Sequence, residues 1–266
     1  LSIMSGSSRS CFRTMATQPR VGLFVTCLVN TIRPNIAMAL AQLLEATGHR
    51  VEVPFAQTCC GQPGYNAGDW DAARALAKQT IAAFEPFDYL IAPSGSCLAT
   101  IRHDYPELLK DDPEWRERAQ RLAAKSWEAL SYFAQQVPLE QLPRVRFPYR
   151  VTYHDSCSGL RSLGIKGQPR QLLARVEGLT LVEMAEAEVC CGFGGTFCVK
   201  YPELSEAMVE RKVQNILKSG AQVLLGGDLG CLMNIAGRLA RIHAPVRVYH
   251  TLEVLAGLAN GPGLNG

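Results

Sequence analysis

Eight of the ten cysteines in this chain follow one spacing pattern that occurs twice. In each copy a first cysteine is followed, after 31 or 32 other residues, by the run Cys-Cys-Gly, and after 35 or 38 further residues by a last cysteine. The first quartet is Cys27, Cys59, Cys60 and Cys97, and the second quartet is Cys157, Cys190, Cys191 and Cys231. Corresponding cysteines lie 130 to 134 residues apart, so the pattern predicts two copies of one structural unit.

Short apolar runs lead into the cysteines of both copies. Runs of this kind that are bounded by Gly, Pro or Ser are typical of buried parallel strands. The predicted strands are residues 21–26, 51–55, 89–92, 151–156, 179–182, 223–225 and 246–249.

Helical patterns separate these strands. Residues 34–47 and 203–219 are each followed by a glycine, which is a common stop signal for a helix. Residues 106–136 are rich in charged residues and predict helices that lead to the second copy, and residues 251–256 predict a closing helix. Alternating strands and helices indicate βαβ units. We therefore predict an α/β fold of two pseudo-symmetric βαβ-type repeats with parallel sheets.

The position of the cysteines after the strands predicts a site in each repeat. In an open α/β sheet, ligands bind outside the carboxyl ends of the strands. We therefore expect the cysteines at the C-terminal strand ends, with the four thiols of each quartet converging. Proline residues around position 143 mark the boundary between the copies. We assign residues 15–142 to the first cysteine-rich repeat and 143–266 to the second, and expect residues 1–14 to be a disordered extension.

Composition excludes several classes of protein. The 27 Lys and Arg residues against 24 Asp and Glu give a net charge of +3, without a basic block, which argues against nucleic acid as a partner. No apolar stretch reaches the length of a transmembrane segment. The chain is too long and too sparse in cysteine for a secreted disulfide scaffold. We therefore expect a cytoplasmic protein whose reduced thiols serve metal or redox chemistry.

Three kinds of site could use four converging thiols. Structural zinc usually takes cysteines from tight C-x2-4-C turns, which neither copy contains. A disulfide between adjacent cysteines closes a strained ring and leaves the flanking cysteines without a role. An iron–sulfur cluster suits the pattern better, because adjacent cysteines can bind different irons and a following glycine allows close backbone approach.

Longer motifs around the cysteines carry a family resemblance. They include Gln-Thr-Cys-Cys-Gly-Gln-Pro at residues 57–63, His-Asp-Ser-Cys at 154–157 and Cys-Cys-Gly-Phe-Gly-Gly-Thr-Phe at 190–197. The chain resembles the cysteine-rich CCG domains of heterodisulfide reductase catalytic subunits and of glycolate oxidase iron–sulfur subunits. Over about residues 20–256 it resembles more closely the lactate-utilisation protein A (LutA/YkgE) family.

The resemblance implies an iron–sulfur, electron-transferring subunit of a multi-subunit oxidoreductase that converts L-lactate to pyruvate. Its partners would be the other subunits of a lactate-utilisation complex, including a further iron–sulfur protein, and the chain alone would not be a complete enzyme. The implied cofactor is a [4Fe–4S] cluster, one or two per chain, bound by the eight cysteines of the two quartets. The alternatives are a heterodisulfide-reductase-like thiol/disulfide redox subunit and a zinc-stapled scaffold without a redox role. No catalytic residue is assigned.

Departures from the family pattern bear on the cluster type. The fuller pattern ends in C-x-x-C, but Ser94 and Asp228 stand at the first of these positions, which leaves four thiols per repeat for an ordinary [4Fe–4S] cluster. Cys11 and Cys198 lie outside the repeated pattern and are expected to be free thiols.

Other residues near the cysteines have open roles. His154 is a candidate ligand, a hydrogen-bond donor to a ligand, or a buried histidine with a structural partner. Arg33, Arg102 and Arg161 follow repeat cysteines and could pair with a small carboxylate or form surface salt bridges.

Overall fold

The computed structural model describes residues 18–266, so the predicted extension at residues 1–14 and Cys11 lie outside the described residues. The described chain contains two four-stranded parallel sheets with equivalent strand orders, β2-β1-β3-β4 and β6-β5-β7-β8. The strands of the first sheet are β1 (Arg20–Leu23), β2 (Arg50–Glu52), β3 (Tyr89–Ala92) and β4 (Ser126–Glu128). Those of the second sheet are β5 (Arg150–His154), β6 (Thr180–Leu181), β7 (Val223–Gly226) and β8 (Arg247–His250). The predicted α/β fold with two parallel repeats is confirmed.

The register of the two sheets is also equivalent. Val21 of β1 lies opposite Val51 and Tyr89 on its two neighbouring strands. Val151 of β5 occupies the same central place in the second sheet, between β6 and β7. Both valines are fully buried, as expected where helices cover a parallel sheet on both faces.

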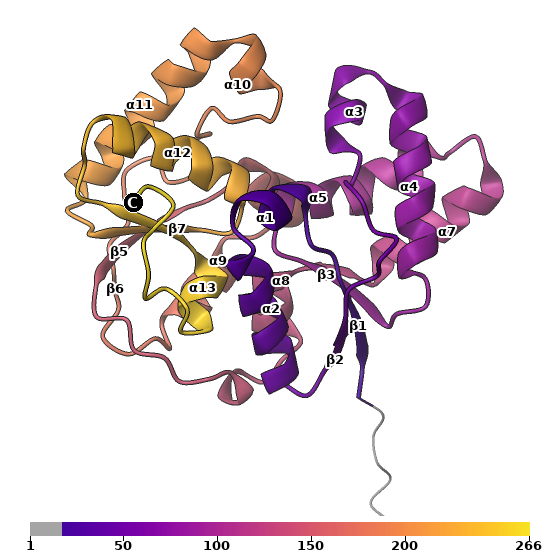
Figure 1. The fold of residues 1–266 in the computed structure, drawn as a ribbon, viewed down its shortest axis with the longest axis horizontal. Helices are drawn as coiled ribbons and strands as arrows, with labels where there is room; N and C mark the ends of the chain where they lie inside the picture. Colours follow the sequence, from indigo (N-terminus) through magenta and orange to yellow (C-terminus); the bar gives the residue numbers. More distant parts are fainter. Residues whose placement is uncertain (1–17) are drawn as a thin grey trace, which may run out of the picture.

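Helices connect the strands and cover the sheets (Figure 1). In the first half they are α1 (Cys27–Ile32), α2 (Asn35–Ala46), α3 (Gln62–Ala67), α4 (Trp70–Phe84), α5 (Gly95–Ala99), α6 (Tyr105–Leu108), α7 (Pro113–Ala124) and α8 (Ala129–Gln135). In the second half they are α9 (Gly167–Leu173), α10 (Phe197–Lys200), α11 (Pro202–Lys218), α12 (Leu229–Arg241) and α13 (Thr251–Leu255). Two π-helical turns, Thr100–Asp104 and Ser158–Ser162, and the 3-10 turn Leu139–Gln141 complete the described elements. None of the described helices is both long and apolar enough to cross a membrane.

The segment 106–136 differs from the sequence expectation. It contains the predicted helices, but also β4, which pairs in parallel with β3 and completes the first sheet. β4 has only three residues, Ser-Trp-Glu, and no apolar run marks it. Its strand conformation therefore comes from pairing with β3, which a local pattern does not reveal.

A shared hydrophobic core joins the two halves. One buried cluster contains Val21, Leu40 and Phe133 of the first half together with Val151 and Tyr249 of the second. Helix α2 packs against α13, and α8 packs against α9. In Figure 1, α3, α4 and α7 lie at one end of the molecule, α10 and α11 lie at the other, and α1 and α5 lie between them. The two halves therefore form one continuous body.

Candidate metal centre

Each quartet forms where strands of one sheet end. Cys27 and Cys157 follow β1 and β5, and Cys97 and Cys231 are the third residues of α5 and α12, the helices that follow β3 and β7. The adjacent pairs lie in the loops after β2 and β6. The expected position of the cysteines at the C-terminal strand ends is therefore confirmed.

The structure brings the four thiols of the first quartet together. Cys59 is in hydrogen-bonding contact with Cys27 and with Cys60, and Cys60 is in contact with Cys97. Cys60 and Cys97 are buried, whereas Cys59 is half-buried and Cys27 is exposed. A group held by these thiols would therefore have one side in the core and one side near solvent.

The second quartet has the same connectivity. Cys190 is in hydrogen-bonding contact with Cys157 and with Cys191, and Cys191 is in contact with Cys231. Cys191 and Cys231 are buried, and the other two are half-buried.

The pKa values of the thiols show how crowded each quartet is. The pKa of Cys59 and that of Cys190 are lowered to about 2, because each sulfur accepts hydrogen bonds from two neighbouring thiols. The pKa values of the donors are raised by those bonds and by burial. Four thiolates in this space would repel one another, so they require a cation to balance their charge. This donor set fits a thiolate-bound metal or cluster.

The glycine of each Cys-Cys-Gly run is required by backbone conformation and packing. Gly61 has φ +84° and Gly192 has φ +87°, values that side-chain-bearing residues rarely adopt. A Cβ on Gly192 would also lie 2.8 Å from the carbonyl oxygen of Ser205 in α11. At Gly192 the absence of a side chain therefore also allows α11 to pack closely against the turn.

Side chains fix the carbonyl groups of the buried cysteines. The Tyr105 hydroxyl donates to the Cys60 carbonyl at 2.8 Å, and the Asn234 amide donates to the Cys191 carbonyl at 2.9 Å. The loops that carry the adjacent cysteines are thus held in place in both repeats, but by different residues in each.

Ser94 and Asp228 cap helices rather than face the quartets as ligands. Ser94 accepts a hydrogen bond from the Cys97 amide, and Asp228 accepts one from the Gly230 amide. One oxygen of Asp228 also accepts bonds from the Ser94 hydroxyl at 3.1 Å and the Ser96 amide at 3.0 Å. The two positions that lack a cysteine thus link the two halves.

His154 lies beside the second quartet. One nitrogen of its ring and the sulfurs of Cys191 and Cys231 all lie within 4.8 Å of one another. The imidazole is buried, and neither nitrogen has a hydrogen-bond partner of good geometry. Burial and the positive charge of Lys212 lower the pKa of His154 to about 3, so the ring is neutral at pH 7.

Lys212 of α11 is a second polar neighbour of this quartet. It is 2% exposed, and its ammonium group donates to the carbonyls of Glu186 and Ala187 in the loop before Cys190. Burial lowers its pKa, whereas the nearby Cys191 and Cys190 act in the opposite direction.

The arginines predicted near the cysteines do not form a carboxylate site. Arg33 donates to the buried Glu253 at 2.8 Å and so links the two halves. Arg102 and Arg161 are exposed. Cys198 lies in α10, where its thiol donates to the Gly195 carbonyl at 3.2 Å.

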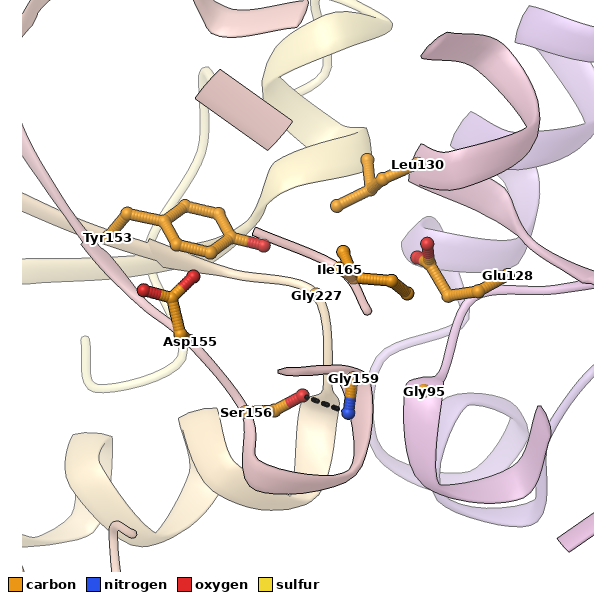
Figure 2. Close-up of a pocket in the computed structure, with 9 residues that line it drawn as sticks. All are labelled: Gly95, Glu128, Leu130, Tyr153, Asp155, Ser156, Gly159, Ile165 and Gly227. Carbon is orange, nitrogen blue, oxygen red and sulfur yellow. Dashed lines mark hydrogen bonds between the residues drawn. The ribbon is translucent and has the colours of Figure 1, made fainter. Parts of the chain in front are cut away.

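A pocket lies at the junction of the two halves (Figure 2). Its polar side chains are Glu128, Tyr153, Asp155 and Ser156. No lysine or arginine is among the residues that line it, and Asp155 is paired with Arg170 at 2.8 and 2.9 Å. The pocket therefore offers no cation to a small carboxylate.

Comparison with known proteins agrees with this architecture. Residues 21–102 and 151–236 both match the family described as CCG, a cysteine-rich domain. A crystal structure of a hypothetical protein from Helicobacter pylori superposes with a TM-score of 0.62, over 91% of this chain and 49% of that chain. At 12% sequence identity this likeness shows the fold alone.

Curated relatives match almost the whole chain. Lactate utilization protein A of Exiguobacterium sp. is 48% identical over 239 residues, which are 89% of this chain and 97% of that protein. Lactate utilization protein A of Geobacillus thermodenitrificans is 46% identical over 236 residues, covering 89% and 98% of the two chains. Because both repeats match the family model and these relatives align over nearly their full length, the chain belongs to the lactate utilization protein A family of cysteine-rich CCG-domain proteins.

Proposed function

We propose that this protein is an iron–sulfur, electron-transferring subunit of a cytoplasmic multi-subunit oxidoreductase that oxidises L-lactate to pyruvate. The observation that carries the proposal is the convergence of four thiols at the strand ends of each repeat. The name of the curated relatives supports the lactate-utilisation role. Each quartet would hold one [4Fe–4S] cluster, which supplies one-electron transfer when bound.

The surroundings of the quartets support electron transfer rather than substrate chemistry in this subunit. Each quartet has a buried side and a side that reaches the surface, which suits exchange of electrons with a partner protein. The pocket between the halves offers no cation to the carboxylate of lactate. We therefore place lactate binding and hydride removal in another subunit, and a further iron–sulfur protein among the partners.

The proposal is tested by measuring iron, acid-labile sulfide and zinc per chain on protein purified without oxygen. We expect about eight iron and eight sulfide, as two [4Fe–4S] clusters contain, and broad absorbance that bleaches on reduction. One or two zinc ions without sulfide would instead support a zinc-stapled scaffold and overturn the proposal.

The lactate role is tested separately with the partner subunits. We expect L-lactate to bleach the absorbance of the assembled complex, and to leave this chain alone unchanged. If a dithiol bleaches the absorbance of the isolated chain and lactate does not bleach that of the complex, the result would favour a thiol/disulfide redox subunit.

A further inference from the structure

The second site contains a nitrogen donor at the position where the first site has a hydrocarbon ring. His154 is the last residue of β5 and stands three positions before Cys157. Phe24 stands three positions before Cys27 in the first repeat. Phe24 is fully buried in the cluster that contains Cys60 and Cys97, and its ring lies 5.5 Å from that of Phe84.

The distances favour His154 as part of the second donor set. A nitrogen of its ring lies within 4.8 Å of the sulfurs of both Cys191 and Cys231. Among the described residues, no other three histidine, cysteine or acidic side chains bring their donor atoms this close together. The first quartet, by comparison, has no fifth donor at the place of Phe24.

The hydrogen-bonding state of His154 points in the same direction. The side chain is 1% exposed and neither ring nitrogen has a hydrogen-bond partner of good geometry. A buried polar group without a partner destabilises the fold, so a native structure that retains one needs another use for it. The Ala187 carbonyl lies near the ring, as a carbonyl does beside the free N–H of many metal-binding histidines.

We propose that His154 donates one imidazole nitrogen to the metal centre held by the second quartet, whereas the first centre is held by thiolates alone. This inference rests on the proposed function. It makes the two sites chemically different, because one iron of the second centre would bind imidazole in place of one of the four thiolates, and such a replacement raises the reduction potential of an iron–sulfur centre. The second site would therefore accept an electron before the first.

The experiment uses the full-length protein purified without oxygen, with ¹⁵N-labelled histidine and partial reduction to populate the higher-potential site. Pulsed electron paramagnetic resonance then detects nitrogen bonded to the paramagnetic centre. Because the chain has five histidines and only His154 lies among the cysteines, a histidine signal is assignable. We expect a strong nitrogen coupling that changes with the isotope.

Variants of the two equivalent positions provide the controls. His154→Phe installs the residue of the first repeat and should abolish the histidine coupling and lower the potential of the second centre only. His154→Leu serves the same purpose if the larger ring does not fold. Phe24→Leu should leave the coupling unchanged, because this position contributes no donor.

Two results would overturn the inference. One is a reduced second centre without a histidine nitrogen coupling, and the other is a coupling that persists in a folded His154 variant. Iron and sulfide are measured on the same samples. Absence of iron contradicts the proposed function, whereas normal iron without the coupling contradicts the assignment of His154 alone.

Discussion

The two quartets have nearly the same cysteine spacing, yet their buried neighbours differ in polarity. Phe24 of the first repeat is buried at the position equivalent to His154 of the second. Thr80 is likewise buried at the position equivalent to Lys212. The second correspondence follows from packing, because Ala73 and Leu76 of α4 contact Gly61 as Ser205 and Met208 of α11 contact Gly192.

This difference shows that the backbone features that position the thiols are independent of the side chains that surround them. Strand ends and the Cys-Cys-Gly turn determine where sulfur atoms converge, and both are the same in the two repeats. The apolar ring of Phe24 in the first repeat, and the polar His154 and cationic Lys212 in the second, give the converging sulfurs different electrostatic environments. Under the proposed function, one protein would thus carry two centres of similar geometry and different potential.

The largest expected effect comes from replacing the glycines of the two turns. A Cβ at Gly192 would lie 2.8 Å from a backbone oxygen, whereas a Cβ at Gly61 would find its nearest neighbour at 3.4 Å. Both variants strain a left-handed residue by about 1–2 kcal/mol, and overpacking adds about 1–3 kcal/mol at Gly192 alone. Urea unfolding of the metal-free variants should show Gly192→Ala as the more destabilised, and equal losses would contradict the packing difference.

A second comparison concerns the residues that end the edge strands β4 and β8. Glu128 caps α8 and His250 caps α13, and both side chains are buried. Burial raises the pKa of Glu128 to about 7 and lowers the pKa of His250 to about 4, so both groups favour their neutral forms. Asp228 further raises the pKa of Glu128.

These shifts predict opposite pH dependences. Because the folded-state pKa of Glu128 is raised from 4.5, its ionisation destabilises the fold as pH rises from about 4.5 through 7, by up to about 3 kcal/mol. His250 destabilises the fold as pH falls from 6.5 towards 4. Relative to wild type, the unfolding free energy of Glu128→Gln should therefore be higher at pH 8 than it is at pH 5. The same pH dependence in wild type and variant would contradict the assignment.

The smallest expected effect concerns Lys212. Lys212→Met should lower the reduction potential of the second centre, because a nearby positive charge stabilises the added electron. Lys125→Met is a matched control, since Lys125 also donates to two backbone carbonyls, but in the first half away from the quartets. A redox titration should show a shift in the Lys212 variant only. Equal shifts in both variants would mean that Lys212 acts through loop structure alone.

The sequence predicts the fold through features that repeat. The paired cysteine spacing and the apolar runs identify the strands around Val21 and Val151, and glycines mark the ends of α2 and α11. β4 is missed because three polar and aromatic residues carry no pattern of their own. The predicted domain bounds at residue 142 or 143 remain predictions.

Local patterns reveal less of the site. Cysteine spacing predicts convergence, but the contacts of Ser94 with Asp228 and of Arg33 with Glu253 depend on how the two halves pack. Lys212 has no local signal in the sequence, because it resembles any other charged residue of an amphipathic helix. Alignment of the two repeats, which places it opposite Thr80, is the signal that could have identified it.

Iron and sulfide content of matched cysteine variants tests the central claim that each quartet binds its own cluster. Cys60→Ser and Cys191→Ser change the buried member of the adjacent pair in each repeat. Each variant, purified without oxygen, should retain about half of the wild-type iron and sulfide, and the double variant should retain almost none. Loss of all iron in either single variant would contradict two independent sites and indicate one shared centre.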